Sequence, residues 1–353
     1  IMSKKNNARE AFKEIPSVDE ILNKIKDSEH IPYHLLKTNI RELLENLRID
    51  IKNNKSPKNI SEYISDRVDI ILKKNSFSSL KSIINGTGII LNTGLGRAPL
   101  SKEIIDSISD TIYPYCNLEV DYTTNKRNNR LDHIEPLINS LVECDSSIMV
   151  NNNAAAVMIM LNSLCKNKKV VISRGQQVEI GGSFRIPDII KSSGCKMIEV
   201  GTTNKTKLSD YEDAIDEKTA AILYVHTSNY KVVGFTEFVD FKKLADLCKD
   251  KGIYLLFDLG SGAIYDSESK KIPFERKVRE YVKLGADIVT YSGDKLLGGI
   301  QSGIISGKKD LVGKIYKNPI YRTMRCDKYR IALMEKILRK YNSSKVINDN
   351  NLS

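Results

Sequence analysis

The stretch DIVTYSGDKLLGGIQSG, residues 287–303, begins with a short β-branched run and continues into a turn of small residues. A short apolar run that ends in glycine and serine is typical of a strand at the edge of an α/β sheet. The turn contains Lys295, although most of the 55 Lys and Arg side chains are expected on solvated faces. A lysine in this position indicates a chemical role.

Further apolar runs of the same length occur on both sides of this stretch. They lie at 146–150, 169–173, 196–200, 220–225, 253–258 and 303–306. Amphipathic helical stretches such as 238–251 separate several of them. This alternation predicts an α/β fold with a mostly parallel sheet and helices on both faces. Ligands of such sheets bind beyond the carboxyl ends of the strands.

The first part of the chain has a different pattern. Residues 18–74 show a helical period without strand signals, with breaks at two prolines. We therefore expect a small helical domain over residues 1–76 and a catalytic core domain over 77–320. Residues 321–353 are expected to begin a further, truncated C-terminal domain. With 353 residues and 41% hydrophobic content, the chain can bury cores of this size.

Composition limits the class of protein. The longest apolar run, Ala154–Leu161, is far shorter than the roughly 20 residues that span a bilayer. The first residues lack the apolar segment of a secretory signal, so we expect a cytoplasmic protein without a membrane partner. The six cysteines are scattered without a CxxC pair, which favours reduced thiols and no metal site.

Positive charge is concentrated near the C-terminal end. The net charge is +11, and residues 305–341 contain 11 Lys and Arg against 3 Asp and Glu. Such a local excess is able to hold phosphate groups. A solvated basic helix is an equally good explanation of the charge alone.

An acidic residue and Lys295 stand in an informative order. In LLFDLGSG, residues 255–262, Asp258 ends an apolar strand, and Lys295 follows 37 residues later beyond another strand. This pair suits pyridoxal phosphate, because a lysine amine forms a Schiff base with the aldehyde and a carboxylate keeps the pyridine nitrogen protonated. Small neighbours favour the neutral amine.

A phosphate site is also expected. The stretch VNNNAAAVMIML begins as a strand, continues through the polar residues Asn152 and Asn153, and becomes an alanine-rich helix from Ala154. The N-terminus of a capped helix offers free backbone N–H groups to a phosphate. Ser292, three residues before Lys295, is positioned in the sequence to add a hydroxyl.

These elements belong to a longer series of motifs over residues 15–338. It includes INGTGIILNTGLGRAPLS, SRGQQVEIGGSFRIPDI, EVGTTNKT, VHTSNYKVVGFTE and NPIYRTMRCDK. The series resembles bacterial selenocysteine synthase, the L-seryl-tRNA(Sec) selenium transferase family. The resemblance implies a fold-type-I enzyme dependent on pyridoxal phosphate. By this resemblance Lys295 carries the cofactor, Asp258 pairs with its ring nitrogen, and residues 152–154 lie around its phosphate.

The resemblance also implies the reaction and its partners. Seryl-tRNA(Sec) would be converted through an aminoacrylyl-tRNA intermediate, with selenophosphate as the selenium donor, to selenocysteinyl-tRNA(Sec). Arg97, Arg322 and Arg325 match family arginines that gather around this anionic donor, which suits the bidentate geometry of guanidinium groups. The helical domain would hold the tRNA. A homo-oligomer built from dimers is implied, with a decameric ring as one such assembly.

The sequence departs from the family pattern at several positions. Gly94, Gln176, Gln177 and Ile300 replace the residues usual there, which affects local loop geometry. Family members also continue through a C-terminal domain after the point where this sequence ends, so a fragment or a weakened enzyme is expected.

Two alternatives and one residue remain open at this point. A small-molecule ammonia lyase of the same fold would have no use for the helical residues 15–74. An inactive RNA-binding homologue would not need Lys295 and Asp258. His226, expected at a strand end, would orient the cofactor ring or a substrate group, or would be a buried structural histidine.

Overall fold

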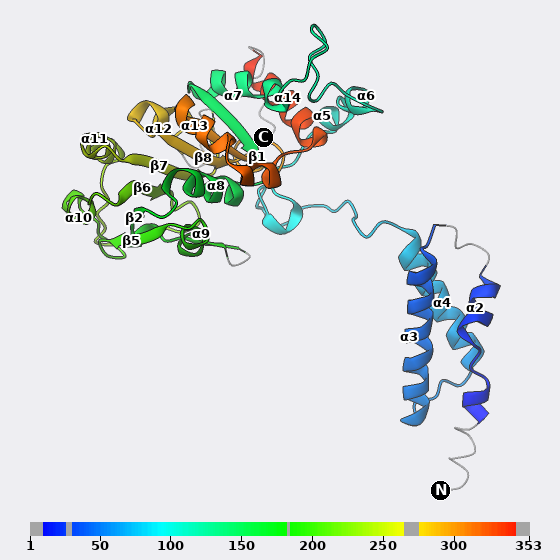
Figure 1. The fold of residues 1–353 in the computed structure, drawn as a ribbon. Coiled ribbons are helices and arrows are strands. Elements are labelled where there is room, and N and C mark those ends of the chain that lie inside the picture. The colour runs from blue at the N-terminus through cyan, green and yellow to red at the C-terminus, as the bar shows by residue number, and fades with distance from the viewer. Residues whose placement is uncertain (1–9, 26–29, 182–183, 265–274, 344–353) are drawn as a thin grey trace. The chain divides into compact units, whose positions relative to one another are not determined.

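The computed structural model describes residues 10–25, 30–181, 184–264 and 275–343 (Figure 1). The chain forms two compact units, Ile1–Ile84 and Asn85–Ser353. The first division therefore lies close to the expected boundary at residue 76. The described residues beyond 320 belong to the second unit, where the last helix packs against the rest of the unit.

The N-terminal unit is helical. Its helices include α2 (Val18–Lys24), α3 (Tyr33–Lys52) and α4 (Ile60–Ser76). Apolar residues of α3 recur every three or four positions and bury one face of the helix. They form the core with residues of α4: Leu36, Ile40, Leu44, Leu47, Ile51, Ile60, Ile64 and Val68. The predicted helical period is thus confirmed for α2, α3 and α4.

The second unit is built around one sheet of seven strands. The strands are β1 (Ser146–Val150), β2 (Lys169–Ser173), β5 (Lys196–Val200), β6 (Thr219–Val225), β7 (Tyr254–Gly260), β8 (Ile288–Ser292) and β9 (Gly303–Gly307). Their order is β1-β9-β8-β7-β6-β2-β5. A small hairpin of β3 (Glu179–Ile180) and β4 (Phe184–Arg185) lies outside this sheet.

The sheet is mostly parallel, as predicted, with one exception. β9 runs antiparallel to both of its neighbours, β1 and β8. The connection between β8 and β9, residues 293–302, is shorter than the dozen or more residues that a parallel crossover requires. The chain therefore turns back on itself directly after Lys295. This places the lysine in the tight turn between β8 and β9.

Helices cover the sheet in two rows (Figure 1). In one row, α8 (Asn153–Cys165) contacts α9 (Ile186–Ser192) and α13 (Lys309–Tyr316). In the other, α10 (Leu208–Ala214), α11 (Phe241–Lys251), α12 (Val278–Leu284) and α7 (Glu135–Val142) contact one another in turn. The remaining helices are α5 (Lys102–Asp106), α6 (Ser109–Ile112), α14 (Lys328–Asn342) and the 3₁₀ turns η1 (Thr93–Leu95), η2 (Arg130–His133), η3 (Arg174–Gln176) and η4 (Pro319–Met324).

Two features of composition are visible in the structure. Within the described part of the chain, no helix combines the length and the apolar character needed to cross a membrane. All six cysteines are free, and Cys165, Cys248 and Cys326 are buried.

Candidate active site

The carboxyl ends of β7 and β8 bring Asp258 and Lys295 to the same place. A Cβ atom on Gly260 would lie 3.9 Å from Asp258 Oδ1 and 4.0 Å from Lys295 Nζ. Gly260 has φ 73°, in the left-handed region that glycine adopts without strain. A side chain at this residue would therefore touch both the acid and the lysine.

Asp258 is buried but only partly satisfied. Its Oδ1 accepts hydrogen bonds from Asn153 Nδ2 at 2.8 Å and from Thr290 Oγ1 at 3.3 Å. Among the described residues, none donates to Oδ2. Burial raises the pKa of Asp258 to about 6, although Asn153, the charge of Lys295 and Thr290 act to lower it. A protonated ring nitrogen would supply the cationic donor that this carboxyl lacks.

Lys295 is half-buried at the same site. Burial lowers the pKa of its amine, and the charge of Arg97 lowers it further, against the carboxylates of Asp258, Asp294 and Glu275. A lowered pKa increases the share of neutral amine, the form that attacks an aldehyde. The surroundings of Lys295 therefore suit covalent chemistry at a carbonyl.

Arg97 is held beside Lys295 by Asp294. Its Nη1 atom lies 3.1 Å from Asp294 Oδ2, and the Ala98 N–H donates to the Asp294 carbonyl at 3.2 Å. The sequence analysis did not single out Asp294. Its partner is 197 residues away, so nothing in the local pattern marks the pair.

The start of α8 and Ser292 lie at the same edge of the sheet. Val150, Gly303 and Ser292 are paired in register across β1, β9 and β8. Asn152 caps α8, because its Oδ1 accepts from the Ala155 N–H at 2.8 Å. The free N–H groups of a first helical turn bind anions. Here the helix follows β1, and only β9 lies between β1 and the strand that ends in Ser292.

Within the described ranges, three buried polar atoms near this edge have no hydrogen-bond partner: Asn151 Oδ1, Asn153 Oδ1 and His226 Nδ1. The backbone N–H of His226 donates to the backbone carbonyl of Asp258 at 2.9 Å, which fixes this histidine at the end of β6. Burial lowers the pKa of its imidazole. Unpaired buried polar atoms destabilise a fold, so their concentration here indicates a bound polar ligand. Together with Asp258 Oδ2 and the Lys295 amine, they fit pyridoxal phosphate.

The structure adds a residue that the sequence analysis missed. Glu275 lies beside the site, where Ser261 Oγ donates to its Oε1 atom, and the same oxygen is 3.9 Å from His226 Nδ1. Burial raises the pKa of Glu275 to about 7, although the charge of Lys295 acts to lower it. No motif or spacing in the sequence marks this glutamate.

Arg322 and Arg325 line a separate groove of about 620 Å³. Its lining also includes Glu119, Arg127 and two tyrosines. The groove adjoins the end of β1, because the Asn151 N–H donates to the Met324 carbonyl at 3.0 Å. The charged side chains that shift the pKa of Lys295 thus include Arg97 but neither Arg322 nor Arg325.

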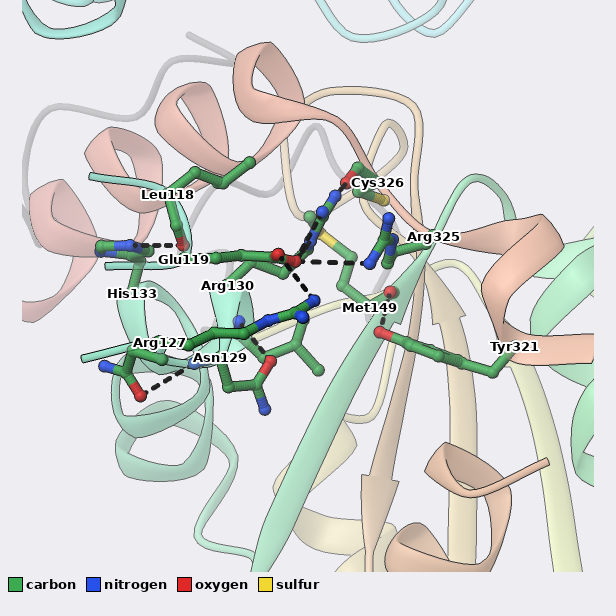
Figure 2. A network of polar contacts seen from close by, with 12 residues as sticks. Leu118, Glu119, Arg127, Asn129, Arg130, His133, Met149, Tyr321, Arg325 and Cys326 are labelled. Atoms are coloured by element: carbon green, nitrogen blue, oxygen red, sulfur yellow. Dashed lines mark hydrogen bonds and ion pairs between the residues drawn. The ribbon is translucent and has the colours of Figure 1, made fainter. Parts of the chain in front are cut away.

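Glu119 forms ion pairs with two arginines of this groove, Arg127 and Arg325, and with Arg130 (Figure 2). Its carboxylate lies 2.7 Å from Arg130 Nη2, 3.3 Å from Arg325 Nη1 and 3.4 Å from Arg127 Nη2. The hydrogen bonds from Arg130 hold the pKa of Glu119 below its usual range. Arg322 is exposed and makes no ion pair with another described residue.

The fold is shared with pyridoxal-phosphate enzymes of known structure. The D-glucosaminate-6-phosphate ammonia-lyase structure has a TM-score of 0.56 at 21% identity, covering 72% of this chain and 69% of that chain. A serine palmitoyltransferase from S. paucimobilis with bound PLP has a TM-score of 0.51 at 12% identity, covering 70% and 60%. At these identities the likeness concerns the fold alone.

Sequence comparison is more specific. The family model for L-seryl-tRNA selenium transferase matches residues 83–350. The L-seryl-tRNA(Sec) selenium transferase of Carboxydothermus hydrogenoformans is 43% identical over 336 residues, covering 94% of this chain and 72% of the relative. That of Aquifex aeolicus is 44% identical over 331 residues, covering 94% and 72%. The chain therefore belongs to the L-seryl-tRNA(Sec) selenium transferase family.

Proposed function

We propose that this chain converts L-seryl-tRNA(Sec) to L-selenocysteinyl-tRNA(Sec), with pyridoxal phosphate as cofactor and selenophosphate as selenium donor. The observation that carries the proposal is the Asp258–Lys295 pair on either side of Gly260 in a chain of this family. The tRNA substrate implies that the reaction takes place in the cytoplasm.

When bound, pyridoxal phosphate supplies an electron sink for the Cα–H bond of the seryl group. Asp258 keeps the ring nitrogen protonated through its free Oδ2 atom. Lys295 would hold the cofactor covalently, and its amine is the group that would accept the proton from Cα. The first turn of α8 and Ser292 would bind the phosphate, while Asn153 and His226 would orient polar groups of the ring.

The selenium donor is assigned to arginines at two places: Arg322 and Arg325 in the groove that adjoins the end of β1, and Arg97 beside Lys295. The exposed, unpaired guanidinium of Arg322 supports this assignment, because a tetrahedral anion would supply its missing partner. Glu119 supports it as well, since its ion pair fixes the direction of Arg325. Arg97 lies beside Lys295, where selenium must reach Cβ of the substrate.

The N-terminal unit is assigned to the tRNA. Exposed basic residues, Arg41, Arg48, Lys52 and Arg67, lie on α3 and α4 and are available to RNA phosphates. Shape and phosphate contacts dominate the recognition of A-form RNA, so a rigid helical unit suits the role.

A homo-oligomer built from dimers is part of the proposal. The second unit exposes large apolar side chains outside its helices and strands: Ile89, Ile90, Tyr113, Tyr115, Tyr122, Val233 and Phe235. Burial of such side chains against a second copy of the chain would stabilise a dimer. Light scattering of the purified protein measures the assembly, and a monomeric mass at micromolar concentration would contradict this part.

The ammonia-lyase alternative is less well supported. The lyase structure shares 21% identity with this chain, whereas selenium transferases share 43 to 44%. An inactive RNA-binding homologue would not require Asp258 and Lys295 to lie together beside Gly260.

The absorbance spectrum of purified protein loaded with pyridoxal phosphate tests the function. We expect the spectrum to change on addition of seryl-tRNA(Sec) and to remain unchanged with the deacylated tRNA or with free serine. An equal response to free serine would favour a small-molecule enzyme. No cofactor spectrum at all would favour the non-catalytic alternative.

A further inference from the structure

Loss of the β-hydroxyl of the seryl group requires a proton, because hydroxide is a poor leaving group near neutral pH. The proposed function assigns Lys295 to the Cα proton and leaves the hydroxyl without a donor. The described charged groups that act on Lys295 are Arg97, Asp258, Asp294 and Glu275. The proton donor is expected among these groups and their contacts.

Most of these groups are unsuited to the task. Arg97 and Asp294 are paired with each other, and a guanidinium does not release its proton in proteins. Asp258 is assigned to the ring nitrogen through its free oxygen. Burial lowers the pKa of His226, which disfavours the charged imidazolium that would donate a proton. Glu275 is the remaining acid.

Glu275 is well placed to hold a transferable proton. Its side chain is 19% exposed and receives a hydrogen bond from Ser261 Oγ at the end of β7. Among the described residues, the ion-pair contact of Glu275 is with His226 Nδ1 at 3.9 Å, which is beyond hydrogen-bond distance, and that buried nitrogen has no hydrogen-bond partner there. Among the described residues no Lys or Arg forms an ion pair with Glu275, so nothing fixes it as a carboxylate.

We propose that Glu275 is the proton donor to the departing β-hydroxyl in the elimination half of the reaction. This inference rests on the proposed function and deepens it. The Cα–H bond breaks and its proton passes to the Lys295 amine, while the electron pair forms the Cα–Cβ double bond. The Cβ–O bond breaks with its pair on oxygen, which takes the proton of Glu275 and leaves as water. Glu275 then regains a proton from solvent.

The proton on Glu275 is observable without the cofactor. In apo protein labelled with [5-¹³C]glutamate, we expect one carboxyl resonance that titrates close to pH 7 and is absent in Glu275→Gln. Ser261, His226 and Lys295 face this carboxyl, so its titration reports their combined effect. In the control Glu212→Gln, which alters an exposed residue of α10, the resonance that titrates close to pH 7 should remain.

The decisive experiment measures the breaking of the Cα–H bond and of the Cβ–O bond separately. With seryl-tRNA(Sec) in D₂O and no selenium donor, deuterium at Cα reports proton removal, and pyruvate after mild deacylation reports loss of the hydroxyl. We expect Glu275→Gln to exchange the Cα proton at a rate within about threefold of the unaltered protein. Elimination should fall by roughly 10²- to 10⁴-fold, the usual contribution of a general acid. Added acetate should partly restore elimination in Glu275→Ala.

Each other outcome has a definite meaning. Equal loss of exchange and elimination would overturn the inference and assign Glu275 to binding, as would elimination at the normal rate in Glu275→Gln. A failure to fold is detected by borohydride attachment of the cofactor to Lys295, which should be unchanged in this variant. If the unaltered protein neither exchanges nor eliminates, the proposed function itself fails, whatever Glu275 does.

Discussion

The amine of Lys295 is partly buried and lies near the guanidinium of Arg97 and the carboxyl of Asp258. We expect borohydride reduction to attach no cofactor to Lys295→Ala, because the amine that forms the covalent link is then missing. Peptide mass spectrometry locates the attached group. The control Lys251→Ala, at the exposed end of α11, should retain it at Lys295. A reduced cofactor on a different lysine would show that the assignment is wrong.

Asp258 gives the apo protein a predictable pH dependence. Its pKa in the folded state is about 6, above the value of roughly 3.9 in an unfolded chain. The folded state therefore binds this proton more tightly, and the associated stability is present below about pH 4 and lost as the pH rises through 6.

We expect the free energy of unfolding of the unaltered apo protein, measured as its difference from that of Asp258→Asn, to decrease as the pH rises. Between pH 4 and pH 7.5 this difference should change by up to about 3 kcal/mol. Glu275 shifts in the same direction but is present in both proteins, so its contribution cancels in the difference. Urea titrations at several pH values provide the measurement. A difference that does not change with pH would mean that Asp258 is not perturbed.

Arg322 and Arg325 are expected to serve only the second half of the reaction. Replacement of either by Ala should leave cofactor loading and loss of the hydroxyl intact but slow selenium addition by roughly 10²-fold, because a donor to a developing anion is lost. Both half-reactions are measured separately, with and without selenophosphate. Arg339→Ala, on α14 with an ion pair to Glu335, is the matched control. Equal losses in both halves would indicate a structural or tRNA-binding role.

At the scale of elements, the phosphate site depends on how closely β9 approaches the start of α8. A Cβ on Gly303 would lie 2.2 Å from the Asn152 carbonyl oxygen, too close for any real contact. Gly303→Ala should therefore displace the first turn of α8 and weaken pyridoxal phosphate binding at least tenfold. Gly313→Ala is the control, because a Cβ there meets nothing within 4 Å in the helix α13. Fluorescence titration of apo protein with the cofactor compares them, and equal affinities would argue against the phosphate site.

At the scale of the whole molecule, the two compact units have separate cores and are assigned separate tasks. Deletion of residues 1–76 should leave the cofactor bound at Lys295 but abolish the preference for tRNA(Sec) over ordinary seryl-tRNA. Binding to both RNAs should remain salt-dependent, with a slope of roughly 0.7 to 0.9 log units for each phosphate neutralised. Gel-shift competition between the two tRNAs makes the comparison.

The outcomes of the deletion distinguish the proposals. A preference that survives the deletion would move recognition to the catalytic unit. No preference in the full chain would favour the small-molecule lyase over the tRNA-dependent enzyme.

The sequence by itself determined the elements and the order of the site. Each strand from β1 to β9 in the large sheet was predicted within a few residues, because buried strands are short continuous apolar runs. Lys295, Asp258 and the cap at Asn152 were identifiable because each depends on its position relative to its own strand or helix. Local patterns contain this information.

Tertiary structure alone decided which side chains meet. The pairing of β9 with β1, the Arg97–Asp294 pair and the Arg325–Glu119 pair join residues that are distant in the chain. Glu275 is the clearest case, since its position beside His226 and Ser261 exists only when β6 and β7 lie next to each other in the sheet. The pKa of a carboxyl depends on burial and neighbouring charges, and both arise only when the chain folds.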